Sequence, residues 1–128
     1  MGTRGFIVIK FNGKVYRVFN PYDSYPSGLG KHIIKYLKKL VKEDKLENTE
    51  DCFYTILGEI LDFTEDYSGE NLEEGDAYFS YNIEWIYTID MDTMELEIES
   101  NIKNRARYNI LNDIFYDIND KYIIKNLF

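Results

Sequence analysis

The sequence has very few of the residues that build cross-links, metal centres or nucleophilic sites. Its 128 residues include one cysteine, Cys52, and one histidine, His32. A lone cysteine excludes an internal disulfide and a cysteine-built metal site, and it is typical of proteins in a reducing compartment. Because Cys52 lies in an apolar helical pattern, we interpret it as a small buried side chain. We expect neither a metal nor a cofactor, since no metal-ligand spacing or nucleotide fingerprint is present.

Long apolar runs are also missing. No run approaches the roughly 18 apolar residues of a membrane span, and residues 1–6 lack the hydrophobic core of a signal peptide. We therefore expect an intracellular protein that is not secreted and has no membrane partner. The length and the apolar content of 45% predict a single domain over residues 1–128.

Positive charge is absent from the middle of the chain. Residues 46–100 contain seventeen acidic residues and no Lys or Arg, whereas residues 1–45 contain ten Lys or Arg and three acidic residues. The net charge of −8 disfavours long-range attraction to nucleic acid. Segments of opposite charge can attract each other within one fold or present opposite faces to different partners, including a second copy in a homodimer.

Alternating apolar side chains on either side of turn signals predict two β-hairpins. The four strands cover residues 3–11, 15–20, 81–90 and 94–99. The first hairpin turns at Asn12-Gly13, the strongest two-residue hairpin signal. The second turns at residues 90–93, and its last strand alternates apolar residues with glutamates, which we interpret as its solvent face.

Three segments carry apolar residues at the spacing of one helical face. They cover about residues 27–44, 49–63 and 110–118. Thr49 followed by Glu50 and Asp51 is typical of an N-cap and an acidic first turn. The element order is therefore β-β-α-α-β-β-α. Because an isolated hairpin is marginal in water, we predict an α+β fold in which both hairpins form one antiparallel sheet covered by helices on one face.

The connector at residues 21–30, PYDSYPSGLG, holds both prolines of the chain. Ser27, Gly28 and Gly30 place a helix start there, and unpaired N–H groups at a helix start attract carboxylate or phosphate. Lys31 adds a cation. The alternative is that Ser27 caps the helix and that the connector satisfies the remaining donors itself.

Two tyrosines in the connector, Tyr22 and Tyr25, flank Asp23 and Ser24. Exposed tyrosines suit recognition, because they offer a large contact area with little side-chain entropy to lose. Packing of both rings on the sheet edge is the alternative. We predict that these four residues bind a ligand together with the helix start.

His32 with Asp23 and Ser24 or Ser27 indicates a second hypothesis, a hydrolytic site. The sequence has neither a nucleophile elbow nor a recognisable oxyanion arrangement. On a helical wheel, His32 falls at the border between the apolar stripe and a lysine face. We therefore favour a packing or surface role for His32.

Five lysines occupy one side of the first predicted helix: Lys31, Lys35, Lys38, Lys39 and Lys42. Such a face can contact phosphates. Nucleic-acid binding is nevertheless disfavoured, because this face has no arginines and no interleaved aromatic residues. The protein's own acidic half is an equally good partner for these lysines.

Three segments carry a family resemblance: MGTRG at residues 1–5, YDSYPSGLG at residues 22–30 and EWIYTID at residues 84–90. With them the chain resembles a family of small proteins of large DNA viruses and fungi that has no assigned activity. The resemblance implies a giant-virus source, and hence a location in the host cytoplasm or the virion. It leaves binding by Arg4, Asp23 and the helix start open. Relatives have a histidine where this chain has Pro21, which lowers the expectation of catalysis.

Three functions remain open from the sequence. The first is a binding module whose connector holds a polar or anionic ligand, or a peptide of a host or viral protein. The second is a hydrolase-type enzyme that uses Asp23 with Arg4, Ser24 or His32. The third is a structural or virion-associated interaction protein assembled through its charge polarity.

Overall fold

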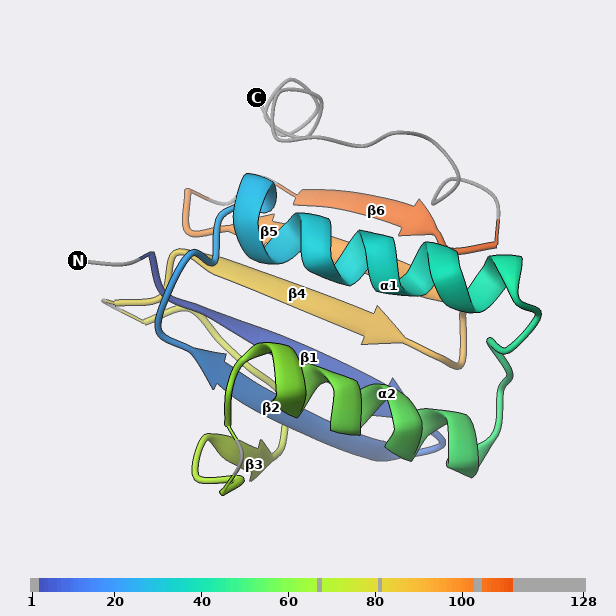
Figure 1. Cartoon of the computed structure of the whole chain (residues 1–128). Coiled ribbons are helices and arrows are strands. Elements are labelled where there is room, and N and C mark those ends of the chain that lie inside the picture. Colours follow the sequence, from blue (N-terminus) through green and yellow to red (C-terminus); the bar gives the residue numbers. More distant parts are fainter. Residues whose placement is uncertain (1–2, 67, 81, 103–104, 112–128) are drawn as a thin grey trace.

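The sheet and its helices form the architecture of the protein (Figure 1). The computed structural model describes residues 3–66, 68–80, 82–102 and 105–111. Six strands form one sheet in the order β3-β2-β1-β4-β5-β6, and α1 and α2 lie side by side over one face (Figure 1). The predicted α+β class is confirmed.

The strands are β1 (Gly5–Phe11), β2 (Lys14–Asn20), β3 (Leu72–Glu74), β4 (Trp85–Asp90), β5 (Glu95–Ser100) and β6 (Arg105–Asn109). The helical elements are a π-helical turn η1 (Pro26–Gly30), α1 (Lys31–Lys42) and α2 (Glu50–Phe63). The turn η1 runs directly into α1, so the first predicted helix is present from the connector onward. No helix in the described ranges is long and apolar enough to cross a membrane.

Both predicted hairpins are confirmed. β1 and β2 pair antiparallel across Asn12-Gly13, where φ is +48° at Asn12 and +83° at Gly13. A two-residue turn of this hand matches the natural twist of the strands, and it requires positive φ at both positions. β4 and β5 also pair antiparallel. Local turn chemistry was therefore sufficient to predict both pairs.

The prediction of an entirely antiparallel sheet is wrong. The two hairpins meet through β1 and β4, which pair in parallel from Gly5 opposite Trp85 to Lys10 opposite Asp90. A parallel pair needs a long crossover connection, and here the chain between β1 and β4 includes β2, both helices and β3. No local signal specifies which strands of two separate hairpins become neighbours.

Two strands were not predicted. β3 lies between the second predicted helix and the third predicted strand, and it pairs with β2 over three residues. β6 pairs with β5 and places arginines opposite the β5 glutamates. The predicted third helix, residues 110–118, lies outside the described residues from residue 112 onward, and Ile110 and Leu111 form a turn.

The main core lies between the helices and one face of the sheet. The strands contribute Ile7, Ile9, Val18, Tyr87, Ile89, Leu96 and Ile98. The helices contribute Leu29, Ile33, Ile34, Leu37, Leu40, Cys52, Phe53, Ile56, Leu57 and Ile60. Cys52 is buried, as predicted, and its Sγ lies 3.5 Å from the Lys45 carbonyl oxygen.

The other face of the sheet is also partly covered. The prediction of helices on one face did not include this second cover. Val8, Ile83 and Ile86 form a smaller buried cluster there. Ala77 and Phe79, from the connection between β3 and β4, pack against this cluster. β4 carries apolar residues on both of its faces, because both faces of the sheet are buried there.

The predicted N-cap of α2 gives a direct test of local stability. Thr49 Oγ1 accepts a hydrogen bond from the Cys52 backbone N–H at 3.2 Å. Replacing Thr49 by alanine leaves that N–H without its partner, so we expect the free energy of unfolding to fall by about 1 kcal/mol. Urea unfolding followed by circular dichroism measures this change.

Thr55→Ala is the matched control for Thr49→Ala. Thr55 lies on the exposed side of the same helix, and its hydroxyl donates to the Asp51 carbonyl at 2.8 Å. The Asp51 carbonyl belongs to the backbone of α2, and this bond is exposed to solvent. We therefore expect the free energy of unfolding to change by no more than about 0.5 kcal/mol. Equal losses in the two variants would contradict a capping role for Thr49.

Candidate functional site

The connector 21–30 is held tightly against the sheet at Ser24. The Ser24 N–H donates to the Thr3 carbonyl at 3.1 Å, and the Tyr87 hydroxyl donates to the Ser24 carbonyl at 2.6 Å. Gly5 permits this approach, because a Cβ there would lie 2.9 Å from Ser24 Cβ. The burial that accompanies these contacts raises the pKa of Tyr87 well above its usual value, which keeps the hydroxyl protonated as a donor.

The side chain of Ser24 serves the same structural purpose. Its Oγ donates to the Asn20 carbonyl at 3.1 Å and accepts from Asn20 Nδ2 at 2.9 Å. Ser24 is 0% exposed. The hydroxyl that we predicted as a ligand contact or nucleophile is therefore occupied within the connector and does not reach solvent.

The expectation of unpaired N–H groups at Gly28 and Gly30 is wrong. The Gly28 N–H donates to the Tyr25 carbonyl at 2.9 Å, the Leu29 N–H to the Asp23 carbonyl at 2.8 Å, and the Gly30 N–H to the Tyr25 carbonyl at 3.5 Å. Asp23 has φ of +50°, a conformation that aspartate tolerates better than most residues. The chain turns back at this residue, and its carbonyls satisfy the helix start in place of an anion.

Ser27 is not the N-cap that we considered. The cap position of η1 is Tyr25, whose side chain makes no capping bond. Lys31 is exposed at the first position of α1. Arg4 is half-buried, and its carbonyl accepts from the Glu84 N–H at 2.9 Å. None of these three predicted binding residues lines the pocket described below.

Both connector tyrosines reach solvent, which was left open by the sequence. Tyr22 is 70% exposed and Tyr25 is 39% exposed. The Tyr25 hydroxyl donates to Asp23 Oδ1 at 3.0 Å, and this carboxylate raises the pKa of Tyr25. Among the residues that the structure describes, no hydrogen bond to the second oxygen of Asp23 is present.

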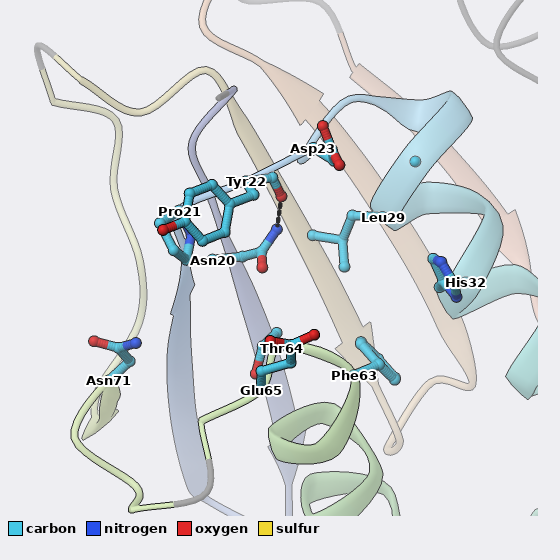
Figure 2. A pocket seen from close by; sticks show the side chains of 11 residues that line it. Asn20, Pro21, Tyr22, Asp23, Leu29, His32, Phe63, Thr64, Glu65 and Asn71 are labelled. Carbon is cyan, nitrogen blue, oxygen red and sulfur yellow. Dashed lines mark hydrogen bonds between the residues drawn. The ribbon is translucent and has the colours of Figure 1, made fainter. Parts of the chain in front are cut away.

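A pocket of about 500 Å³ lies between the connector and the end of α2 (Figure 2). Its lining residues are Asn20, Pro21, Tyr22, Asp23, Gly28, Leu29, His32, Phe63, Thr64, Glu65 and Asn71. Tyr22, Asp23 and Gly28 are predicted site residues that the structure brings together here. The remaining lining comes from the end of β2, the rest of the connector, the first turn of α1, the end of α2 and the residue before β3.

Asn20 presents an unpaired acceptor to this pocket. Only 6% of the residue is exposed. Its Nδ2 donates to the carbonyl of Tyr22 and to Ser24 Oγ, which fixes the orientation of the amide. Oδ1 has no partner in the described part of the chain, and it points toward the side of the pocket where Thr64 and Glu65 lie (Figure 2). Oδ1 is not one of the fully buried side-chain atoms that lack a partner, so a ligand in the pocket can reach it.

Among the described residues, the pocket lining contains two acidic residues and no Lys or Arg. The carboxylates of Asp23 and Glu65 both lie in the lining. The C-terminal end of α2, which carries partial negative charge, contributes Phe63 and the C-cap residue Thr64. The Thr64 hydroxyl donates back to the Ile60 carbonyl at 2.7 Å. The electrostatic character therefore suits a ligand that donates hydrogen bonds or carries positive charge.

His32, in the first turn of α1, also lines the pocket. Its ring stacks on Phe63 with ring centroids 6.4 Å apart and planes inclined by 19°, while the residue stays exposed. This is the border position that the helical wheel predicted. Within the described ranges, no hydrogen bond joins His32 to Asp23 or Ser24, so the elements of a catalytic triad are not assembled.

Sequence reasoning missed the half of the pocket that follows in the chain after α1. Phe63, Thr64, Glu65 and Asn71 carry no motif, and only the position of α2 on the sheet brings them to the connector. Asn20 could be recognised only as the last residue of a strand.

The comparisons with known proteins leave the site to be interpreted from its own geometry. Searches against protein-family models, curated proteins and solved structures found no match to the chain. Among the described residues, no group of three or more His, Cys, Asp or Glu could hold a metal ion.

Proposed function

We propose that the protein is a non-enzymatic binding module whose pocket holds a polar ligand, or a side chain of a peptide, through hydrogen bonds donated by that ligand. The observation that carries this proposal is the free Oδ1 of Asn20. Although only 6% of Asn20 is exposed, its Oδ1 remains open to the pocket. Here the amide is fixed by two bonds on one side, and its acceptor points into a pocket.

The charges of the lining support a basic group as the favoured ligand. Asp23 and Glu65 provide two carboxylates near the pocket, and an ammonium or guanidinium group can donate to them and to Asn20 Oδ1 together. Tyr22 adds an exposed ring that can stack on such a cation. An anionic ligand is less well supported, because the helix-start N–H groups are already bonded within the connector.

A hydrolytic function has weaker support than binding. A hydrolase with Ser24 as its nucleophile requires that the serine hydroxyl be accessible. Ser24 is buried, and its hydroxyl is hydrogen-bonded to Asn20. We propose the intracellular location, in host cytoplasm or virion, that composition and resemblance predict. The lone buried cysteine supports a reducing environment.

The ligand class can be tested by an NMR titration with arginine amide as the probe, beside sodium acetate and inorganic phosphate. We expect arginine amide to shift the backbone amide signals of Asn20, Tyr22 and Asn71. In the double variant Asp23→Asn, Glu65→Gln, the affinity should fall about tenfold, since an accessible ion pair contributes up to about 1 kcal/mol. Asparagine keeps the positive φ of Asp23 accessible.

Asp62→Asn is the matched control. Asp62 is an exposed acid in the last turn of α2 that does not line the pocket, so its variant should bind arginine amide like the unmodified protein. Phosphate or acetate shifting the pocket signals in preference to arginine amide would contradict the basic-ligand assignment. No probe binding at the pocket at all would contradict the binding function itself.

A further inference from the structure

The lysines of α1 are the main group of cations without an acidic partner in the described part of the chain. In contrast, cations of the first hairpin and of β6 form ion pairs with acidic residues. These pairs are Lys10 with Asp76, Lys14 with Glu50, Arg17 with Glu73, and Arg107 with Glu97. No ion pair involves Lys31, Lys35, Lys38, Lys39 or Lys42 among the described residues. The protein's own acidic half, which the sequence offered as one possible partner, therefore forms no ion pair with these lysines among the described residues.

Four of these lysines border a groove between α1 and α2. The groove has a volume of about 470 Å³ and is lined by His32, Lys35, Tyr36, Lys38, Lys39, Lys42, Glu59 and Phe63. Its apolar surface comes from Tyr36 and Phe63, which are partly buried and pack against the main core. Burial raises the pKa of Tyr36 to about 12, with a further contribution from Glu59. The hydroxyl is therefore neutral, and among the described residues Glu59 is the one carboxylate in the lining of the groove.

The spacing of the lysines matches the length of a short helix. Lys42 follows Lys35 by seven residues, which corresponds to about 10 Å along the axis of α1 at 1.5 Å per residue. A ligand helix of similar orientation could place apolar side chains on Tyr36 and Phe63 and carboxylates beside the lysines. Helix-in-groove recognition of this kind uses anchors at i, i+3, i+4 and i+7.

We infer that the groove between α1 and α2 is a docking site for an acidic amphipathic helix of a partner protein. The complementarity is twofold, since the apolar face of such a helix covers Tyr36 and Phe63 while its acidic flanks pair with Lys35, Lys39 and Lys42. This surface is distinct from the proposed ligand pocket. The two adjoin at His32 and Phe63, which line both.

Other polyanions fit this groove less well. A phosphate backbone would leave the apolar surface of Tyr36 and Phe63 uncovered, and the groove has no arginine to bind phosphate with two hydrogen bonds. The acidic strand β5 of a second copy is also a poor occupant. Its glutamates already face Arg105 and Arg107 of the adjacent strand.

The test uses the full chain and a synthetic peptide of about 14 residues, four helical turns, with leucines at helical spacing and glutamates at most other positions. Fluorescence anisotropy of the labelled peptide measures binding at low salt and at about 0.15 M salt. We expect Lys35→Glu, Lys39→Glu to weaken binding at least tenfold. Lys31→Glu, Lys45→Glu, which makes the same charge change outside the groove, should alter it less than threefold.

A scrambled peptide of identical composition separates amphipathic docking from charge attraction alone. We expect it to bind at least tenfold more weakly, because its leucines no longer form one face. Equal binding of the two peptides would overturn the inference. It would also be overturned if a single-stranded oligonucleotide or vesicles of anionic lipid outcompeted the peptide at the groove, or if the same lysines mediated self-association of the chain.

Two further measurements make these results decisive. Circular dichroism and thermal unfolding establish that both charge-reversal variants remain folded, as exposed α1 positions should permit. The variant Asp23→Asn, Glu65→Gln should keep full affinity for the acidic peptide. Loss of arginine amide binding with retained peptide binding shows that the two surfaces act separately, so either proposal can fail without the other.

Discussion

Replacing Phe53 by alanine is expected to lower the free energy of unfolding by about 3–5 kcal/mol. Phe53 is 0% exposed and lies on the face of α2 that meets the first hairpin. Its ring centroid is 5.8 Å from that of Phe11 and 5.9 Å from that of Tyr16. Alanine removes the apolar surface that these rings cover and leaves a cavity that the sheet can close only in part. Chemical denaturation, analysed as a two-state transition, measures the loss.

Tyr54→Ala is the control for Phe53→Ala, because it removes the neighbouring aromatic ring from the same helix. Tyr54 is 46% exposed, and its main contact outside the helix is Lys14 Nζ, which lies 5.0 Å from the ring centroid. We expect a loss of about 1 kcal/mol or less. Similar losses for the two variants would contradict the placement of Phe53 between α2 and the hairpin.

Replacing Tyr87 by phenylalanine is expected to cost about 1–3 kcal/mol of stability, although only one oxygen atom is removed. The Tyr87 hydroxyl donates to the buried Ser24 carbonyl at 2.6 Å. Phenylalanine leaves that carbonyl without this donor in a place that water does not reach. Because Ser24 holds the connector, we also expect the variant to bind arginine amide more weakly. Denaturant unfolding and the NMR titration measure the two effects.

Tyr25→Phe removes a hydroxyl from the same connector and serves as the control for Tyr87→Phe. Its bond to Asp23 Oδ1 is at the surface, where water can replace it, so the loss should stay within about 0.5 kcal/mol. If the surface hydroxyl proved as costly as the buried one, the connector would not be anchored through Tyr87.

Alkaline pH gives a measure of the burial of the Tyr87 hydroxyl. The folded state raises the pKa of Tyr87 well above its usual value of 10.0, so between the unfolded and folded pKa values the native state binds more protons. Stability must then fall as the pH rises above about 10. Tyr36, whose pKa is raised to about 12, contributes in the same direction. We expect Tyr87→Phe to have a shallower alkaline decline, and an unchanged slope would contradict the burial of this hydroxyl.

Features that depend on neighbouring residues were predicted well. The turn at Asn12-Gly13 and the cap at Thr49 each involve backbone conformations or hydrogen bonds within a few residues. Their chemistry is set by side chains next to them in the chain. The apolar face of β5 was equally readable, because a half-buried strand alternates with a period of two. Its glutamates, predicted to face only solvent, instead meet the arginines of β6.

The candidate site was predicted only on the connector side. Tyr22, Asp23 and Gly28 do line the pocket, but Ser24 is a structural anchor and the N–H groups of Gly28 and Gly30 are occupied. A sequence indicates that a helix start has donors, whereas the conformation of the connector decides where those donors point. The positive φ of Asp23 directs its carbonyl to Leu29 and removes the expected anion cradle.

The sequence by itself determined the α+β class, the two hairpins, the helices after the connector and the position of the lysine face, because each is encoded by periodicity or by adjacent residues. Tertiary structure alone decided the parallel pairing of β1 with β4, the pocket completed by the end of α2, and the groove between the helices. These features join segments that lie far apart in the chain. Which segments meet depends on how all the apolar faces can be buried at once, and no local pattern contains that information.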